Sequence, residues 1–447
     1  MPIEHLLPPS RRRARARRRP SFRGFVAALV VASSLVAPAA RVASADGTPP
    51  PPPPPLGDLT FYGRGYGHGV GMSQYGARGR ALAGQTAADI LAHYYQGTAV
   101  GTVSTTTNVR VLLLTGFKGT VAKPLAIKGL GRWTIDGVAS QFPPGARLTL
   151  APTAAGATTW TLKVFAPTGE VLFTKVAKTT VTVRSVSIGG TIQLTSKATA
   201  TNVYRGMLRV RLSKTAQVIN HVPLDRYLWG VVPLEMPSSW PVEALKAQAV
   251  AARSYAVSHL HPTYGSWDVY DDTRSQVYRG RKAETTTGRA AVAGTAGQVL
   301  TSGSTVISAL FHSADGGATE NNENVYTSST GAIVAGPMPY LRGMDDRAPD
   351  GTSYDAASPY ATWKTATYPA ATLGEMLALD PRTNVGDLTA IGLTNRGVSG
   401  RLISVTLTGS LGTKTVSGEV FRSVFNAKKP ATDPQLRSTL FDIAPIP

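Results

Sequence analysis

The sequence predicts an α+β fold, built mostly from antiparallel strands around one central buried helix. Between about Asn108 and His221, short runs rich in Val, Thr, Leu and aromatic residues alternate with Gly, Pro and Asn/Asp turns every eight to twelve residues, as is typical of antiparallel strands. Residues 240–260 instead repeat apolar side chains at spacings of three and four, which indicates a helix. Strand-like runs return from Val299 to the end, including VISALF, LISVTLTG and TVSGEVF. With 45 glycines and 16% charged residues, long helices throughout are not expected.

The predicted helix has apolar side chains on most of its sides. Pro241 suits its first turn, where a missing N–H costs nothing. One stripe and part of a second are formed by Val242, Leu245, Ala249, Ala252 and Ala256, with Val250 and Val257. A helix that is apolar nearly all round is expected to be buried. Earlier in the chain, Thr86 is a plausible N-cap for a short helix that buries Ile90, Leu91 and Tyr94.

The N-terminus has the features of an export signal. Residues 11–19 read RRRARARRR, residues 25–40 are uncharged and apolar, and Ala43-Ser44-Ala45 matches the small-x-small cleavage pattern. The apolar run is shorter than the roughly 20 residues of a stable membrane anchor, so we expect cleavage; an uncleaved anchor is the alternative, and the twin-arginine motif is not clean. Residues 46–57 form a proline-rich linker, expected to be an extended, semi-rigid spacer. The mature chain is expected to be secreted to the cell wall, without a stable membrane span.

Charge narrows the possible partners. Residues 1–45 hold nine arginines and one glutamate, so their removal lowers the net charge from +20 to +12. The remaining excess suits an acidic partner, and outside the cytoplasm that means wall polymers or anionic lipid. Nucleic acid, which a pI of about 10.2 could also suggest, is not expected. The chain has no cysteine, which excludes disulfides and thiolate metal sites.

Four polar clusters could carry chemistry, and Glu235 is the first. It lies in the apolar, proline-pinned stretch VVPLEMP. An unpaired carboxyl group in apolar surroundings has a raised pKa and can donate a proton near neutral pH. A glutamate that reaches solvent or caps the next helix is the alternative. Lys246 or Arg253 would oppose the effect of burial if either lay beside this carboxylate.

The other three clusters are mixed polar groups, for which internal hydrogen bonding is the alternative to ligand binding. They are Lys246, Gln248, Arg253 and Tyr255 on the helix, the loop 271–278 with Asp272, Ser275, Gln276 and Tyr278, and His312 with Ser313. A serine-hydrolase triad is disfavoured, since neighbours on a strand face opposite ways and no G-x-S-x-G elbow is present. His259-x-His261 lacks the H-E-x-x-H pattern of a zinc site. The glycine-rich stretch around His68 is not a phosphate loop, and its glycines indicate a tight backbone turn.

The amino-acid sequence around these clusters resembles that of the sporulation stage II protein D (SpoIID)/LytB family. The resemblance rests on INHVPLDRYLWGVVPLEMPSSWPVEALKAQAVAARSY (219–255), DDTRSQVYRG, ALFHSADGGATENNENVY, SGRLISVTLTG, LRSTLFDI and GRGYGHGVGMSQYGARGRALAGQTAADILAHYYQGT. It covers most of residues 58–447. It implies that Glu235 is catalytic and that the polar residues of the other clusters bind substrate, together with His68 and Gln74. No cofactor and no metal are implied.

Two departures from the family pattern affect these expectations. Leu-Asp-Arg-Tyr at 224–227 replaces Leu-Glu-Asp/Glu-Tyr and would place the cation of Arg226 near the site. The GHGVGMSQYGA block opens this chain, whereas in the family arrangement it follows the LRST-x-F ending. A circular permutation explains this order, since chain ends often lie close together at a surface. We therefore divide the chain into a signal peptide (1–45), a linker (46–57), the relocated block packing on the C-terminal part (58–98), a β-rich region (99–201) and the SpoIID/LytB core (202–447).

The resemblance implies action on peptidoglycan. One branch of the family is a lytic transglycosylase, which cuts glycan strands and leaves 1,6-anhydromuramic ends. LytB-type relatives are non-catalytic modifiers of a wall amidase, so both glycan strands and an amidase are expected partners. A lytic transglycosylase needs one carboxyl group, whereas ordinary glycosidases use two. If the protein were a hydrolase, Asp271, Asp272 or Glu243 would be the second acid.

Overall fold

The computed structural model describes residues 56–446, except 188, 198 and 262–264. The predicted signal peptide and nearly all of the proline-rich linker lie outside these residues. Within them, no helix is both long and apolar enough to cross a membrane. The fold is mixed α+β, and most strand pairs are antiparallel, as predicted; the parallel pairs are β16 with β4 and β19 with β2.

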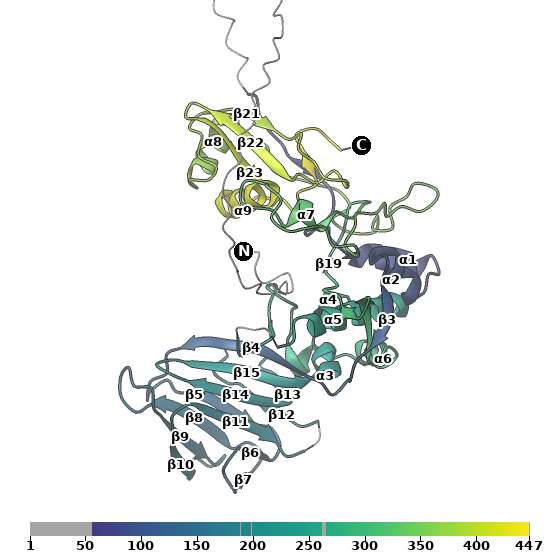
Figure 1. Ribbon diagram of the computed structural model, residues 1–447. Coiled ribbons are helices and arrows are strands. Elements are labelled where there is room, and N and C mark those ends of the chain that lie inside the picture. The colour runs from purple at the N-terminus through teal and green to yellow at the C-terminus, as the bar shows by residue number, and fades with distance from the viewer. Residues whose placement is uncertain (1–55, 188, 198, 262–264, 447) are drawn as a thin grey trace, which may run out of the picture.

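Two sheets form a β lobe that includes most of the predicted β-rich region (Figure 1). The seven-stranded sheet runs β16 (Val269–Tyr270), β4 (Asn108–Phe117), β15 (Ala216–Pro223), β14 (Met207–Leu212), β11 (Thr180–Ser185), β6 (Trp133–Ile135) and β7 (Gln141–Phe142). The six-stranded sheet runs β10 (Val171–Ala177), β9 (Trp160–Phe165), β8 (Arg147–Pro152), β5 (Leu125–Gly129), β12 (Thr191–Gln193) and β13 (Val203–Arg205). Buried residues of both sheets share one hydrophobic core. The strands continue to residue 223, so the predicted boundary at 201/202 cuts through both sheets.

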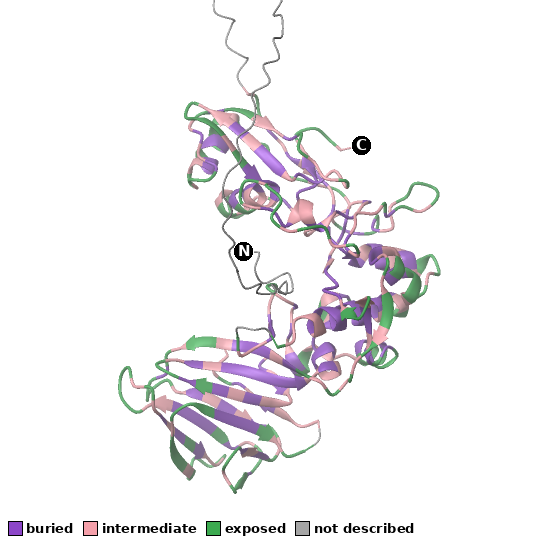
Figure 2. Ribbon diagram, in the orientation of Figure 1, coloured by how far each residue is buried: buried purple, intermediate pink, exposed green. Residues whose placement is uncertain are grey.

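A helical layer adjoins the β lobe and shares its core. The layer consists of α1 (Gln74–Leu82), α2 (Ala87–Tyr94), α3 (Leu224–Trp229), α4 (Val232–Glu235), α5 (Val242–Ser258) and α6 (Thr286–Ala293). Helix α5 packs against α1, α2, α3, α4 and α6, and it is buried from Ala244 to Ala256 apart from Lys246. The apolar spacing of its sequence is thus explained by contacts on several sides (Figure 2).

A C-terminal lobe has a separate core. Its sheets are β20-β1-β24 (Trp363–Lys364, Tyr62–Gly63, Phe441–Asp442) and β21-β22-β23 (Leu388–Gly392, Ser404–Gly409, Gly412–Ser417), with helices α8 (Ala370–Ala378) and α9 (Gly418–Lys428). Phe61, from the beginning of the chain, is fully buried and meets the rings of Phe421, Phe425 and Phe441 edge-on. The segment just before β1 therefore contributes to the core of the C-terminal lobe.

Shorter elements connect the lobes. They are β2 (Met72–Ser73), β3 (Ala99–Thr102), β17 (Gln298–Ser302), β18 (Thr305–Val306), β19 (Phe311–His312), α7 (Asn322–Val325) and a 3₁₀ turn at Gly280–Ala283. The glycine-rich stretch leads from the C-terminal lobe to the helical layer, and Gly65, Gly67, Gly69 and Gly71 all have positive φ. At Gly71 a Cβ atom would lie 2.1 Å from the carbonyl oxygen of Leu310, so only glycine fits there. Close backbone approach therefore explains why glycine occupies position 71.

Three sequence expectations were wrong in detail. TVSGEVF is not one strand, because β23 ends at Ser417, whose side chain accepts a hydrogen bond from Val420 N–H and caps α9. Of VISALF, only its ends belong to strands, in β18 and β19. Helix α1 was not foreseen, since Gly76 and Gly79 disfavour a helix. The structure uses Gly76 for close packing: a Cβ there would lie 2.1 Å from the Tyr94 hydroxyl.

Candidate functional site

Glu235 ends α4, a single helical turn that begins just after Val231. Pro233 stands near the helix start, and Met236 beyond it is extended. Val232 and Met236 are fully buried, whereas Glu235 is partly exposed. Two apolar anchors thus fix the turn, and the carboxyl group between them keeps an edge open to solvent. In Figure 1, α4 and α5 lie between the β lobe and the C-terminal lobe.

Neutral donors hold the Glu235 carboxylate. Oε1 accepts the backbone N–H of Val277 at 3.1 Å, and Oε2 accepts the side-chain amide of Gln74 at 3.3 Å. Burial raises the pKa of Glu235 above its ordinary value, and these two hydrogen bonds offset part of the effect. Among the described residues, no ion pair or hydrogen bond joins Glu235 to a cation or to a second carboxylate. A carboxyl group in such surroundings suits a proton donor.

The loop after β16 positions the Val277 donor. Gln276 is buried, accepts the Tyr227 hydroxyl at 3.0 Å and donates to the carbonyl of Ala252 at 3.3 Å. Tyr278 is also buried and donates to Asn220 at 2.9 Å. The two predicted binding residues therefore act as internal anchors of the loop, on either side of the backbone group that meets Glu235. Sequence reasoning missed Val277, since a backbone donor leaves no trace in residue type.

Gln74 reaches the site from the relocated block at the start of α1. The Ser73 hydroxyl caps this helix by accepting from Gly76 N–H. Gln74 also donates to Gln248 Oε1 at 3.5 Å, a weak bond, while the Gln248 amide nitrogen is buried without a partner among the described residues. An unpaired buried donor is uncommon in folded proteins and marks a place where a ligand could bind. Gln74 and Gln248 thus line up beside the carboxylate.

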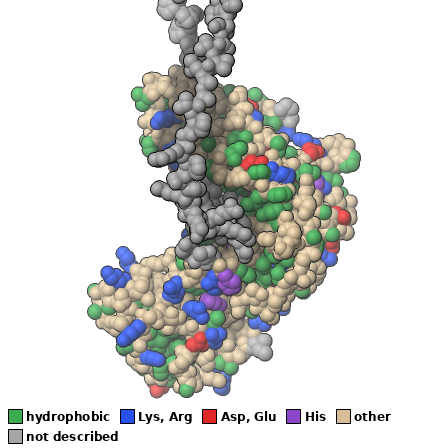
Figure 3. Space-filling model, viewed as in Figure 1, with side chains coloured by type: hydrophobic (Ala, Val, Ile, Leu, Met, Phe, Trp, Pro, Cys, Tyr) green, Lys and Arg blue, Asp and Glu red, His purple; other side chains and the backbone are tan. Residues whose placement is uncertain are grey.

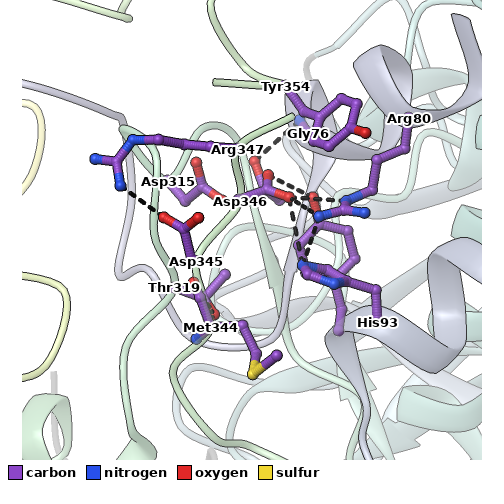
Figure 4. Close-up of polar contacts among 12 residues, drawn as sticks. Gly76, Arg80, His93, Asp315, Thr319, Met344, Asp345, Asp346, Arg347 and Tyr354 are labelled. Atoms are coloured by element: carbon purple, nitrogen blue, oxygen red, sulfur yellow. Dashed lines mark hydrogen bonds and ion pairs between the residues drawn. The ribbon is translucent and has the colours of Figure 1, made fainter. Parts of the chain in front are cut away.

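A buried ionic network fixes the other end of α1 (Figure 4). Arg80 donates to Asp346 at 2.8 Å, and the Tyr94 hydroxyl donates to the same carboxylate at 2.7 Å. Burial pushes the pKa of Asp346 up, but the hydrogen bonds of His93 and Asp315 and the charge of Arg80 outweigh it, giving about 2. Asp346 therefore remains ionised and ties the helix that carries Gln74 to the segment before β20.

His68 and His312 form an aromatic cluster with Tyr326. The His68 ring lies 5.3 Å from that of His312 and 6.2 Å from that of Tyr326. Burial lowers the pKa of His68 to about 4 and that of His312 well below its ordinary value, so both rings are neutral at pH 7. Burial raises the pKa of Tyr255 to about 12, with Ser275 lowering it and the charge of Glu235 raising it. The sequence did not single out Tyr326, whose pKa is raised mainly by burial.

Other predicted binding residues lie away from the carboxylate or are engaged elsewhere. Lys246 pairs with Glu243 at 2.8 Å. Arg253 has a fully buried side chain that bonds Asp225 at 3.1 Å and the carbonyls of Val292 and Gln298. A guanidinium so enclosed positions the helices and does not reach a substrate in this conformation. The sequence left open whether Lys246 or Arg253 lies close enough to oppose the effect of burial on Glu235. Its pKa responds to burial and two neutral donors, and neither of these cations nor Arg226 is among its causes.

The possible second acids are also engaged. Glu243 accepts the N–H of Ala87 at 2.8 Å besides pairing with Lys246, Asp271 pairs with Lys197, and Asp272 pairs with Arg274 at 2.7 Å. No hydrogen bond between described residues joins His312 to Ser313, and His312 Nδ1 faces the Val70 carbonyl at 3.2 Å. Across the described ranges, no group of three or more His, Asp and Glu side chains is placed to hold a metal.

An aromatic pair that includes the chain neighbour of Gln74 was not recognised from the sequence. Tyr75 follows Gln74, and its ring meets Trp240 edge-on at 4.8 Å. The guanidinium of Arg78 lies 5.6 Å from the Trp240 ring. All three side chains are partly exposed. Tyr75 and Trp240 are far apart in the sequence, so nothing in the sequence indicates their contact.

Comparison with known proteins places part of the chain in a family. The family described as Stage II sporulation protein (SpoIID) matches residues 212–302, a range that contains Glu235 and the predicted residues from Lys246 to Tyr278. Stage II sporulation protein D of Bacillus subtilis is 36% identical over 39% of this chain and 51% of its own length. The amidase enhancer of Bacillus subtilis is 36% identical over 31% of this chain and 20% of its own length. An uncharacterized protein of Brachyspira hyodysenteriae is 36% identical over 32% of this chain and 37% of its own length.

The chain thus spans about half of the sporulation protein and smaller parts of the other two relatives. The matched domain and the level of identity agree with the motifs around Glu235 and the loop 271–278. Residues 212–302 are thus similar to the SpoIID family, and the chain resembles Stage II sporulation protein D and the amidase enhancer over 39% and 31% of its length.

Proposed function

We propose that this protein is an exported peptidoglycan lytic transglycosylase with Glu235 as its catalytic acid and base. The observation that carries the proposal is a partly buried carboxyl group held by two neutral donors, with a pKa raised by burial. No second carboxylate contacts it among the described residues. A single carboxyl group that changes roles is what this reaction needs, whereas most glycosidases use a pair.

The proton moves in two steps. The Glu235 carboxyl group protonates the glycosidic oxygen as the bond from muramic acid C1 to that oxygen breaks. The resulting carboxylate then takes the proton of the muramic acid C6 hydroxyl, and O6 bonds to C1 to close a 1,6-anhydro ring. Glu235 ends the cycle protonated, so no water is consumed.

The surroundings of Glu235 suit a sugar polymer. The Gln74 amide contacts the carboxylate and the Gln248 side chain, and the partly exposed rings of Tyr75 and Trp240 offer apolar faces on which a sugar can pack. Export rests on the sequence of residues 1–45. The similarity to Stage II sporulation protein D supports a role at the cell wall.

The test is product analysis with purified protein and peptide-free glycan strands. We expect 1,6-anhydromuramic ends from the wild type and none from Glu235→Gln. The matched controls Glu243→Gln and Asp272→Asn remove other carboxylates and should retain activity. If the wild type produced reducing ends instead of anhydro ends, and one of these controls lost that activity, the protein would be a hydrolase and the proposal would be overturned.

A second function is favoured by a different observation, the 36% identity to an amidase enhancer. In that case the protein holds glycan and stimulates a wall amidase without cutting the strand. Stimulation of amidase product release that survives Glu235→Gln, with no anhydro ends from the wild type, would favour this function over the enzyme.

A further inference from the structure

A pocket of about 740 Å³ lies on the seven-stranded sheet, and none of its lining residues belongs to the site around Glu235. Two rows of paired residues cross its floor: Thr180–Arg211–Gln217 and Thr182–Arg209–Ile219. Residues two apart on a strand share a face, so both arginines of β14 point to the same side as the threonines of β11. Ser266 and Trp267 stand at the rim.

The charges around this pocket do not balance. Arg110, which also lines it, is paired with the buried Asp268 at 2.5 Å. Arg184, on the same face of β11, is paired with Asp136 at 2.6 Å. The two nearby acids are thus each engaged by another arginine. No ion pair among the described residues engages Arg209 or Arg211, and Arg209 acts on Asp136 only through its charge, which helps to lower the pKa of that carboxyl group. Figure 3 shows Lys and Arg side chains spread over the β lobe, with fewer acidic ones.

The guanidinium groups of Arg209 and Arg211 have donors without partners among the described residues. Arg209 Nε is buried, and nothing among the described residues accepts a hydrogen bond from it. Arg211 is exposed, and no hydrogen bond or ion pair within the described ranges engages its guanidinium. Burying an unsatisfied charged donor costs free energy, and placing a second guanidinium beside it adds repulsion. Neither arrangement stabilises the sheet, so an external anion is the partner that explains it.

We propose that this pocket binds an oxyanion group of a saccharide polymer, with Arg209 and Arg211 on the oxyanion and Trp267 against a sugar ring. The planar guanidinium fork matches both carboxylate and phosphate, and the hydroxyls of Thr180 and Thr182 with the Gln217 amide suit sugar hydroxyls. The oxyanion is either the lactyl carboxylate of muramic acid or the phosphodiester of an anionic wall polymer. Naming a wall polymer as the ligand rests on the proposed function; the pocket itself does not.

Binding measurements can test the pocket separately from catalysis. The purified protein carrying Glu235→Gln, which should not consume the strands, is titrated with peptide-free glycan, poly(glycerol phosphate) and uncharged chitin oligosaccharides. Arg211→Ala and Arg209→Gln are compared with Lys175→Ala, which removes an exposed cation from β10 in the other sheet. Arg211 is exposed, so its substitution should leave the fold intact, as a thermal melt will show.

We expect either arginine substitution to weaken binding of an anionic polymer about tenfold, the loss of one charge-assisted contact. Lys175→Ala should change it less than twofold. A loss on glycan identifies the carboxylate as the ligand, and a loss on poly(glycerol phosphate) identifies the phosphodiester. Losses no larger than that of Lys175→Ala on both polymers, or equal losses on neutral chitin, overturn the proposal. If the protein with Glu235 intact forms anhydro ends normally and the arginine substitutions leave binding unaffected, the pocket alone is rejected. If that protein forms no anhydro ends but the affinity depends on the arginines, the enzyme alone is rejected.

Discussion

The side-chain amide of Gln74 donates a 3.3 Å hydrogen bond to Glu235 Oε2, across 161 positions of the sequence. Because the donor is neutral, it favours the carboxylate less than a cation would, and burial still raises the pKa. The GHGVGMSQYGA block therefore takes part directly in setting the proton affinity of the candidate acid. This contact links a motif near the beginning of the described chain to the residue on which the proposed chemistry depends.

Substitution of Gln74 by Ala is expected to raise the pKa of Glu235 further, because one of the two hydrogen bonds that favour the charged form is lost. The proposed acid works when protonated, so kcat/KM falls as pH rises through its pKa. The alkaline limb of the kcat/KM profile should therefore move to higher pH in Gln74→Ala. Gln141→Ala, an exposed glutamine on β7, should leave the limb in place. An unmoved or lowered limb in Gln74→Ala would show that this contact does not tune the acid.

The raised pKa of Glu235 also predicts how stability depends on pH. Its folded pKa lies above the unfolded value, so the folded state prefers the protonated form, and stability decreases as pH rises through the window between the two values. Once the pH exceeds the folded pKa the full cost is present, and Glu235→Gln should then raise the free energy of unfolding. Below the unfolded value near 4.5 the difference should shrink. Urea unfolding at pH 7 and pH 4 measures it, and an equal difference at both pH values would contradict the assignment.

Neighbouring aspartates provide a matched test of the network in Figure 4. The Asp346 side chain is fully buried against Arg80, whereas Asp345 is 62% exposed and pairs with an exposed Arg347. Asp346→Ala leaves a buried guanidinium unpaired and should cost about 3–5 kcal/mol. Asp345→Ala breaks a surface pair and should cost less than about 1 kcal/mol.

The Asp346 contribution should also depend on pH in the opposite sense to that of Glu235. Its pKa is lowered to about 2 from 3.8, so the stabilisation is present above pH 3.8 and is lost as pH falls towards 2. Chemical unfolding of both variants and the wild type across this range measures it. Equal costs for Asp345→Ala and Asp346→Ala at pH 7 would show that burial of the pair is not what matters.

The sequence predicted the elements whose signals are local. Helix α5 and the Thr86 N-cap of α2 follow from spacing and residue type, and strands β4, β8, β9, β11 and β14 lie where runs rich in Val, Thr and Leu indicated them. Helix α9 was missed because TVSGEVF was interpreted as one strand. The Ser417 cap and the spacing of Phe421, Val424 and Phe425 were signals that could have revealed it.

The candidate site was predictable as a set of residues and not as a geometry. Glu235 stood out by its apolar setting, but the roles of its neighbours depend on which atoms are buried. Gln276 and Arg253 have the residue types of binding groups, and only the fold shows that their polar atoms are used internally. Val277 contributes a backbone N–H, and Tyr75 meets Trp240 across a long stretch of chain. Contacts of these kinds leave no periodicity to detect.

We propose that the chain is a circular permutation of the family arrangement, because its motifs occur in a different order. Strand β1 pairs antiparallel with β24, Tyr62 opposite Asp442, and Arg64 donates to the carbonyl of Ile446 at 3.2 Å. The end of the described chain thus lies beside its beginning. A short glycine-serine linker from residue 446 to residue 57 would form a hairpin connection, and new ends can be opened between Thr105 and Thr106 in the loop before β4.

A protein with the order 106–446, linker, 57–105 should fold with the same contacts and keep Phe61 in the C-terminal core. We expect a thermal midpoint within a few degrees of the parent chain without residues 1–56, because loop closure depends only weakly on which ends are joined. Phe61→Ala should destabilise both forms by about 3–5 kcal/mol, the cost of an emptied aromatic site. A permuted chain that is unfolded, or one that folds but is insensitive to Phe61→Ala, would show that the relocated block does not occupy the place of a C-terminal block.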